Sequence, residues 1–142
     1  MNKWDKRFIK LAEHISFWSK DPSTKCGSVI VDNDNRIVSV GFNGYPKGVP
    51  DDDLDDRTNK YAKVIHGEVN SILFSKCDIK GYTMYVWPMP PCSHCASVII
   101  QSGISRVVTK RATEEQNERW GDLIKITEDM FKKASVKLEY FS

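Results

Sequence analysis

The segment Tyr82-Thr83-Met84-Tyr85-Val86-Trp87-Pro88-Met89-Pro90-Pro91 decides the fold. Its first six residues are mostly aromatic or β-branched, which is typical of a buried strand, and the prolines that follow end that strand. Residues 92–101 can form the next helix, and residues 104–109 predict a further strand. A strand, a helix and a strand in this order indicate a parallel pair with the helix packed across it.

Toward the N-terminus, an amphipathic helix is predicted by apolar residues at helical spacing, namely Trp4, Phe8, Leu11, Ile15 and Trp18. Pro22 ends this helix. Residues 26–31 and 36–40 predict two strands, and the turn-forming residues 32–35 join them as a hairpin. Between residues 41 and 63 the periodicity is lost, which indicates a long loop of the kind that usually serves function.

Toward the C-terminus, three more elements are predicted. Residues 69–74 indicate a short buried helix, residues 114–134 an amphipathic helix, and residues 136–140 a last strand. We therefore expect one domain over residues 1–142, with a three-layer α/β/α fold. Its five-stranded mixed sheet should be mostly parallel, with the first hairpin as an antiparallel edge and helices on both faces.

Composition narrows the classes of function. The chain has 142 residues, of which 40% are hydrophobic and 28% charged, enough for one core and unlike a disordered chain. The net charge is +2 with basic and acidic residues interspersed, so no nucleic-acid partner is expected. No apolar run reaches the roughly 20 residues of a membrane span, and no secretory signal is visible. We expect a soluble, cytoplasmic protein with reduced cysteines and no membrane partner.

Two short segments carry chemistry, His66-Gly67-Glu68 and Pro91-Cys92-Ser93-His94-Cys95. Each lies where a loop meets a predicted helix, with Pro91 in the first turn of the second one, and such junctions meet at one end of the sheet. Cys92 and Cys95 are one helical turn apart, and a helix N-terminus lowers a thiol pKa, so both thiolates can face one ion. Together with His66 they form a zinc site whose fourth position stays open for water.

Glu68 strengthens this interpretation. A carboxylate beside zinc but not bound to it can take a proton from water and pass it to a leaving amine. His-x-Glu combined with Pro-Cys-x-x-Cys is the signature of zinc-dependent base deaminases. The alternative is a closed structural zinc site with His94 or Cys26 as fourth ligand, which leaves Glu68 unexplained. Otherwise Cys26 and Cys77 are expected to be ordinary buried thiols.

Further segments of the chain resemble the deoxycytidylate (dCMP) deaminases of the cytidine/deoxycytidylate deaminase superfamily. In chain order these segments are residues 19–27, Gly41-Phe42-Asn43-Gly44-Tyr45-Pro46, His66-Gly67-Glu68-Val69-Asn70-Ser71-Ile72 and residues 91–104. The resemblance implies a cytidine-deaminase-like fold and hydrolysis of dCMP to dUMP and ammonia. In that reaction Zn2+ on His66, Cys92 and Cys95 would activate water, and Glu68 would move the proton.

The resemblance also implies substrate contacts and regulation. The residues expected to contact the substrate are Asn43, Asn70, Lys25, Ser23 and Thr24. Asn43 has the alternative interpretation of a turn residue, and Lys25 that of a solvated cation at a strand edge. Members of the family are commonly homohexamers, activated by dCTP and inhibited by dTTP with Mg2+. Asn43 and Gly44 are the positions for such an effector, and dCTP is a possible second substrate.

Two other functions compete with this one. The first is a related deaminase acting on free cytidine or deoxycytidine, or on a base in nucleic acid. Free-nucleoside enzymes usually carry cysteine where His66 stands, and nucleic-acid enzymes need a basic groove with stacking aromatics. The second is a non-catalytic, zinc-stabilised interaction module, in which Glu68 would have no chemical role.

Overall fold

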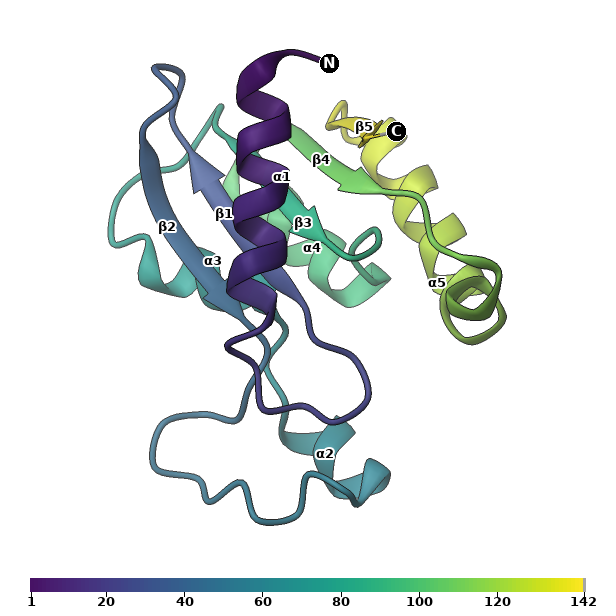
Figure 1. Cartoon of the computed structure of the whole chain (residues 1–142). Helices are drawn as coiled ribbons and strands as arrows, with labels where there is room; N and C mark the ends of the chain where they lie inside the picture. The colour runs from purple at the N-terminus through teal and green to yellow at the C-terminus, as the bar shows by residue number, and fades with distance from the viewer. Residues whose placement is uncertain (142) are drawn as a thin grey trace.

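The computed structural model describes residues 1–141 (Figure 1). In chain order the elements are α1 (Lys3–Ser16), β1 (Gly27–Val31), β2 (Ile37–Phe42), α2 (Arg57–Lys63), α3 (Gly67–Phe74), β3 (Thr83–Trp87), α4 (Ser93–Ser102), β4 (Arg106–Lys110), α5 (Glu114–Lys133) and β5 (Lys137–Phe141). They form the expected α/β/α domain with one five-stranded mixed sheet.

The strand order in the sheet is β2-β1-β3-β4-β5. β3, β4 and β5 are parallel neighbours, whereas β1 is antiparallel to both β2 and β3. The expectation of a mostly parallel sheet with one antiparallel hairpin was therefore wrong at the β1–β3 pair. The crossover through α3 returns the chain parallel to β2 but on the far side of β1. Since β1 opposes β2, it also opposes β3.

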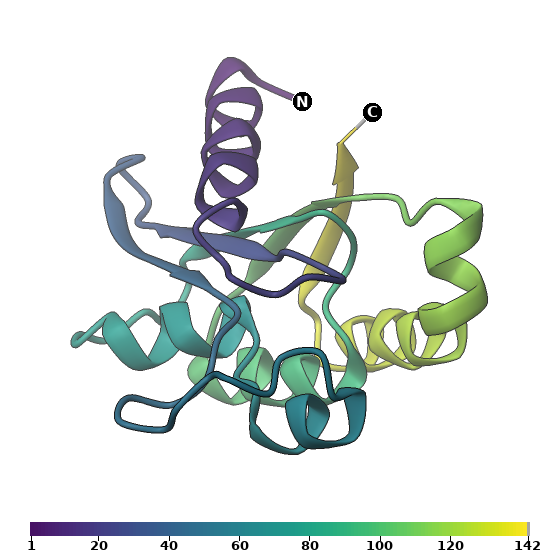
Figure 2. The same cartoon turned by 60° about the horizontal axis from the view of Figure 1, so that its bottom comes forward.

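Helices cover the two faces of the sheet unequally (Figure 2). α1 alone covers one face, where Phe8 and Ala12 pack against Val29 and Tyr85. α3, α4 and α5 cover the other face, in a core built from Ile30, Met84, Val86, Ala96, Ile99, Val107 and Phe131. Neighbouring strand residues such as Val29 and Ile30 belong to different faces, as strand geometry requires.

The N-terminal helix is shorter than expected. α1 ends at Ser16, so Trp18 lies beyond it and its side chain is 53% exposed. Its ring meets the ring of Phe42 edge-on at 6.1 Å instead of entering the core. The expected place of Trp18 in the apolar stripe was wrong because the helix stops before the stripe reaches it.

The expected loop over residues 41–63 contains α2. Asp56 caps this helix by accepting a hydrogen bond from the Asn59 N–H. Only Lys60 of its seven residues is buried. A helix with a single buried residue has no apolar stripe, so periodicity does not reveal it.

α3 lies unusually close to β2. A Cβ atom at Gly41 would stand 2.4 Å from the Gly67 carbonyl oxygen and 2.5 Å from the Ser71 nitrogen. The Ser71 hydroxyl bonds to the Ser28 hydroxyl on β1 at 2.8 Å and donates to the Glu68 carbonyl at 2.8 Å. The first turn of α3 is thereby fixed against the sheet. No helix within residues 1–141 is long and apolar enough to cross a membrane.

Candidate active site

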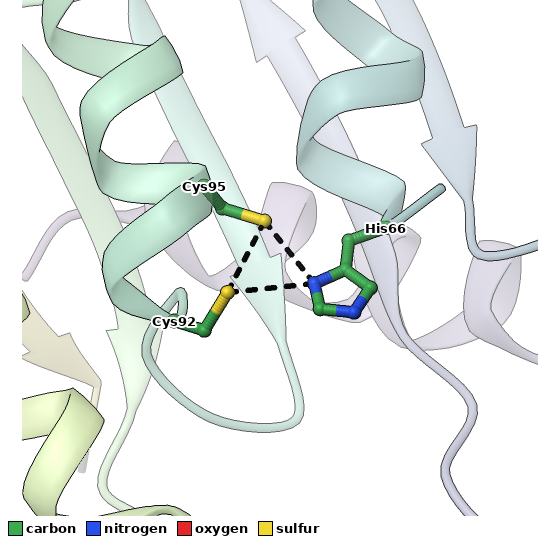
Figure 3. A group of neighbouring side chains, drawn as sticks. All are labelled: His66, Cys92 and Cys95. Atoms are coloured by element: carbon green, nitrogen blue, oxygen red, sulfur yellow. Dashed lines mark hydrogen bonds between the residues drawn. The ribbon is translucent and has the colours of Figure 1, made fainter. Parts of the chain in front are cut away.

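Two helices begin side by side at the centre of the molecule. His66 is the N-cap residue of α3 and Cys92 the N-cap residue of α4, and neither side chain caps its own helix. Both side chains are thus free to turn toward each other, as Figure 3 shows. Pro91 precedes the N-cap instead of entering the first turn, because Cys92 itself keeps an extended backbone.

His66, Cys92 and Cys95 meet at one point (Figure 3). The His66 Nδ1 atom lies 3.2 Å from Cys95 Sγ and 3.6 Å from Cys92 Sγ, and the two sulfur atoms are 3.6 Å apart. Tetrahedral zinc, with bonds of about 2.3 Å to sulfur and about 2.05 Å to nitrogen, requires separations of about 3.6–3.8 Å. Both separations from Cys92 reach the lower end of this range, and the His66–Cys95 separation is shorter than it. The donor set is therefore one that zinc accepts, and a bound ion would move His66 and Cys95 slightly apart.

The alternative of a closed four-residue metal site finds no support in the described part of the chain. Within residues 1–141, the metal-binding group contains His66, Cys92 and Cys95 and no fourth His, Cys, Asp or Glu. His94 is exposed, and neither His94 nor Cys26 is part of this group. Three protein donors leave one tetrahedral position open.

The three side chains of the cluster shift one another's pKa. The hydrogen bond from Cys95, and a further one from His66, lower the pKa of Cys92 to about 4, while the same contact with Cys92 raises the pKa of His66 to about 9. The hydrogen bond with Cys92 and burial raise the pKa of Cys95. One thiolate thus forms easily and the second is opposed by the first. A divalent cation removes that opposition because it stabilises both thiolates.

Glu68 lies in the first turn of α3 and is 4% exposed. Burial raises the pKa of its carboxyl, and the charge of His66 works against that rise. Glu68 lines the same cavity as His66 but stands outside the metal-binding group. This is the position of a carboxylate that moves protons beside a metal without binding it.

The main cavity is an open cleft with about 660 Å³ of unfilled space, the solvent at its mouth included. His66, Cys92 and Glu68 line it. Of the expected substrate residues, Ser23, Thr24 and Asn43 line it as well, whereas Lys25 and Asn70 do not.

Three of the expected substrate residues make well-defined internal contacts. The Lys25 ammonium donates to the Ser19 carbonyl, and the Asn70 amide donates to the Phe42 carbonyl at 2.9 Å. The Asn43 side chain accepts from the Cys26 N–H at 2.9 Å and donates to the Thr24 carbonyl at 2.9 Å. Asn43 therefore ties the chain before β1 to the chain after β2 at the wall of the cavity.

Several residues of the cavity were missed from the sequence. Lys60 and Tyr61 line it from α2, which ends just before His66. Arg119 and Trp120 line it from α5, which lies far from both motifs along the chain. Asp56 is a residue type that commonly starts a helix, but it gives no sign that Lys60 is buried at a cavity. Arg119 and Trp120 had no signal, because their spacing is that of an ordinary surface of an amphipathic helix.

The two remaining cysteines differ from the expectation. Cys26 lines the main cavity, and burial together with the nearby Glu68 and Asp21 carboxylates raises the pKa of its thiol. Cys77 is exposed, so its expected burial was wrong. It lies after the end of α3, where the chain leaves the core.

A second cavity, of about 580 Å³, adjoins the main one. Asn43 and Gly44 line it, together with Lys20 and Asp51. Lys20 and Asp51 form an ion pair of 3.2 Å across it. Asn43 and Gly44, the positions expected for an effector, therefore line a cavity.

Comparison with known proteins points to one family. Residues 2–111 match the family model described as the cytidine and deoxycytidylate deaminase zinc-binding region. An uncharacterised deaminase from the luxG 3′ region of Aliivibrio fischeri is 50% identical over 141 residues, covering 99% of this chain and 95% of that protein. A probable deoxycytidylate deaminase from Caenorhabditis elegans is 44% identical over 111 residues, covering 74% of this chain but only 56% of that protein.

The fold is also found among solved structures. The dCMP deaminase of the cyanophage S-TIM5, in its apo form, superimposes with a TM-score of 0.78 at 25% identity, covering 99% of this chain and 100% of that one. The structure of the cyanophage enzyme with dCMP and dUMP has a TM-score of 0.76 at 23% identity and covers 99% of each chain.

Proposed function

The chain belongs to the cytidine and deoxycytidylate deaminase family, and from this premise we propose that it hydrolyses dCMP to dUMP and ammonia. One observation carries the proposal. The cluster of His66, Cys92 and Cys95 lies beside a buried carboxylate, Glu68, at the wall of the main cavity. A closed structural zinc site would have no use for that carboxylate.

We assign the metal to His66, Cys92 and Cys95. Zinc held there supplies Lewis-acid activation of a water molecule. Glu68, which does not belong to the metal group, accepts the proton that this water loses. It then delivers that proton to ring nitrogen 3 of the cytosine.

The second half of the reaction uses the same carboxylate. The water oxygen adds to C4 of the cytosine, and the proton that remains on this oxygen passes through Glu68 to the amino group. The C4–N bond then breaks as the C4=O bond forms, and the amino group leaves as ammonia. Cytosine and one water give uracil and one ammonia, so atoms and charge balance. Burial raises the pKa of the Glu68 carboxyl, which makes it a better proton acceptor than an exposed glutamate, and the same group can return the proton.

The walls of the main cavity support a nucleotide ligand. Ser23 and Thr24 offer hydroxyls, and Asn43 holds the two loops that form one wall. In the second cavity, Asn43 and Gly44 are the positions we assign to a triphosphate effector with Mg2+. Regulation by dCTP and dTTP, a homohexameric assembly and a cytoplasmic location belong to the same proposal, by analogy with the family.

The test begins with substrate choice. Purified protein is assayed for ammonia release from dCMP, deoxycytidine and a single-stranded DNA oligonucleotide containing cytosine. We expect dCMP to have the highest kcat/KM. Equal or better turnover of deoxycytidine or of the oligonucleotide would reject the assignment to nucleotides.

One variant separates the enzyme from a zinc-stabilised interaction module. Glu68→Gln should keep bound zinc and the thermal midpoint while deamination is lost, because Glu68 does not hold the metal. Glu115→Gln, an exposed position at the start of α5, is the matched control and should retain full activity. A Glu68→Gln protein that deaminates dCMP as fast as the wild type contradicts the proposed mechanism.

A further inference from the structure

The phosphate end of the substrate needs a cation that the sequence did not identify. Lys25 does not line the main cavity, and its ammonium is held by the Ser19 carbonyl. The backbone N–H groups of Ser23 and Thr24 are also taken, since both donate to Asp21 Oδ1, at 2.8 and 3.1 Å. A phosphate therefore has to find its charge partner elsewhere on the wall.

The charged side chains that line the main cavity include two cations outside the metal cluster, Lys60 and Arg119. The Lys60 ammonium lies 3.2 Å from Asp21 Oδ1, with 2% of the lysine and 8% of the aspartate side chain exposed. This pair is neutral as a unit. Within residues 1–141, Arg119 makes no ion pair with a carboxylate. Of these two cations, Arg119 is therefore the one that is available to pair with the negative charge of a ligand.

Arg119 is held in place by a hydrogen bond to a residue of another helix that also lines the cavity. Its Nη2 donates to the Tyr61 hydroxyl on α2 at 2.8 Å. The Tyr61 ring in turn meets the Trp120 ring edge-on at 6.3 Å. Tyr61 and Trp120 also line the cavity. A guanidinium has five N–H donors, so one bond to Tyr61 leaves a fork that is free for two phosphate oxygens.

We propose that Arg119, positioned by Tyr61, binds the 5′-phosphate of the substrate and makes this site prefer a nucleotide to a nucleoside. The proposal deepens the proposed function and rests on it. Arginine suits the role because its planar fork matches phosphate oxygens in pairs and its charge does not titrate. The Tyr61 hydroxyl accepts from Arg119, so its own hydrogen remains available to the same phosphate.

Lys60 and Ser23 complete the phosphate subsite. The Lys60 ammonium donates to the Ser23 hydroxyl at 3.2 Å, and that oxygen acts as acceptor. The hydroxyl hydrogen of Ser23 is therefore free to donate to a ligand in the cavity. Ser23 acts directly on the phosphate, whereas Lys60 is a positioning residue that works through Ser23 and Asp21.

Steady-state kinetics with dCMP and with deoxycytidine test the proposal. The variants are Arg119→Gln, Arg119→Lys and Tyr61→Phe, with Lys125→Gln as control. Lys125 is exposed on the same helix and does not line the cavity, so its variant removes the same charge without touching the site. Thermal melting of each variant checks its folding, and since Arg119 is exposed, we expect its variants to keep the wild-type midpoint.

We expect Arg119→Gln to lower the ratio of kcat/KM for dCMP to that for deoxycytidine by about 10- to 100-fold, the effect of removing one hydrogen bond between charged groups. The loss should appear in KM rather than in kcat. Arg119→Lys should restore part of it, Tyr61→Phe should cause a smaller loss of the same kind, and Lys125→Gln should match the wild type.

Two results overturn the inference while leaving the proposed function intact. One is an unchanged ratio in Arg119→Gln, and the other is an equal loss for both substrates, which would mean that Arg119 serves the fold or the chemistry. A wild-type protein that does not deaminate dCMP refutes the proposed function itself and removes the basis of the inference. Binding of dUMP, measured by calorimetry, gives an independent readout and should weaken in Arg119→Gln.

Discussion

The carboxylate of Asp5 on α1 and the guanidinium of Arg106 on β4 form a two-point ion pair between residues 101 positions apart. The Arg106 Nη1 and Nη2 atoms donate to Asp5 Oδ1 and Oδ2 at 3.0 and 2.8 Å. The Tyr85 hydroxyl donates to the same carboxylate at 2.6 Å, and only 2% of the Asp5 side chain is exposed. This contact ties the single helix on one face to the middle of the sheet.

Removing that carboxylate should destabilise the protein. We expect Asp5→Asn to lower the free energy of unfolding by about 3 kcal/mol. This is the lower end of the range of energies lost when one partner of a buried ion pair is removed. Urea denaturation measures the change. Asp34→Asn, where the side chain is 81% exposed beside Arg36, is the control and should leave the midpoint where it is. An Asp5→Asn protein as stable as the control would contradict the assigned role.

The stability that the Asp5–Arg106 ion pair contributes should depend on pH. Burial raises the pKa of Asp5, but the hydrogen bonds from Arg106 and Tyr85 and the charge of Arg106 outweigh it, so the pKa lies below its ordinary value. A lowered folded-state pKa gives stability that is present above the unfolded-state pKa of about 3.9 and is lost as pH falls through the folded-state value. The stability difference between wild type and Asp5→Asn should therefore narrow below about pH 4. A difference that stays constant down to the acid limit would argue against this cause.

The zinc content of the protein should depend on Cys92 and not on Cys77. Wild-type protein should contain about one zinc per chain, and Cys92→Ser should lose most of it because a neutral serine hydroxyl is a poor zinc ligand. Cys77→Ser changes an exposed thiol and should keep the wild-type content. Elemental analysis measures the metal. Chelation should then lower the thermal midpoint of wild type and Cys77→Ser but hardly that of Cys92→Ser.

The contact between β2 and α3 has its own test. Gly41→Ala places a Cβ 2.4 Å from the Gly67 carbonyl oxygen, so the backbone has to move, at a cost of about 1–3 kcal/mol. Gly44→Ala meets nothing within 4 Å and is the matched control. Thermal and urea denaturation should separate the two variants clearly. Equal stability of both would show that α3 can shift away from the strand at no cost.

The grouping of His66, Cys92 and Cys95 was predictable because it depends on short segments of sequence. These donors and Glu68 lie within two short segments, and a helix begins in each of them, at His66 and at Cys92. Side-chain type and spacing of one helical turn are enough to place two donors on one side. Which end of the sheet they share follows from the alternation of strands and helices.

What escaped prediction depends on contacts between distant segments. The direction of β1 against β3 is set by where the crossover through α3 lands, which the order of elements does not specify. Arg119 meets Tyr61 only because α5 and α2 close over the same cavity, 58 positions apart in the chain. The burial of Lys60 likewise requires Asp21 as partner, and nothing in the local sequence announces a buried lysine.

The place of His66 and Cys92 as N-cap residues has a consequence for how this end of the molecule moves. Two adjacent helices begin at these residues, and in both the side chain that would normally cap the first turn is turned toward the shared cluster. An ion bound to this cluster would therefore link the first turns of α3 and α4. Fraying of either end has to wait for the ion to leave, so the two ends loosen together rather than one at a time.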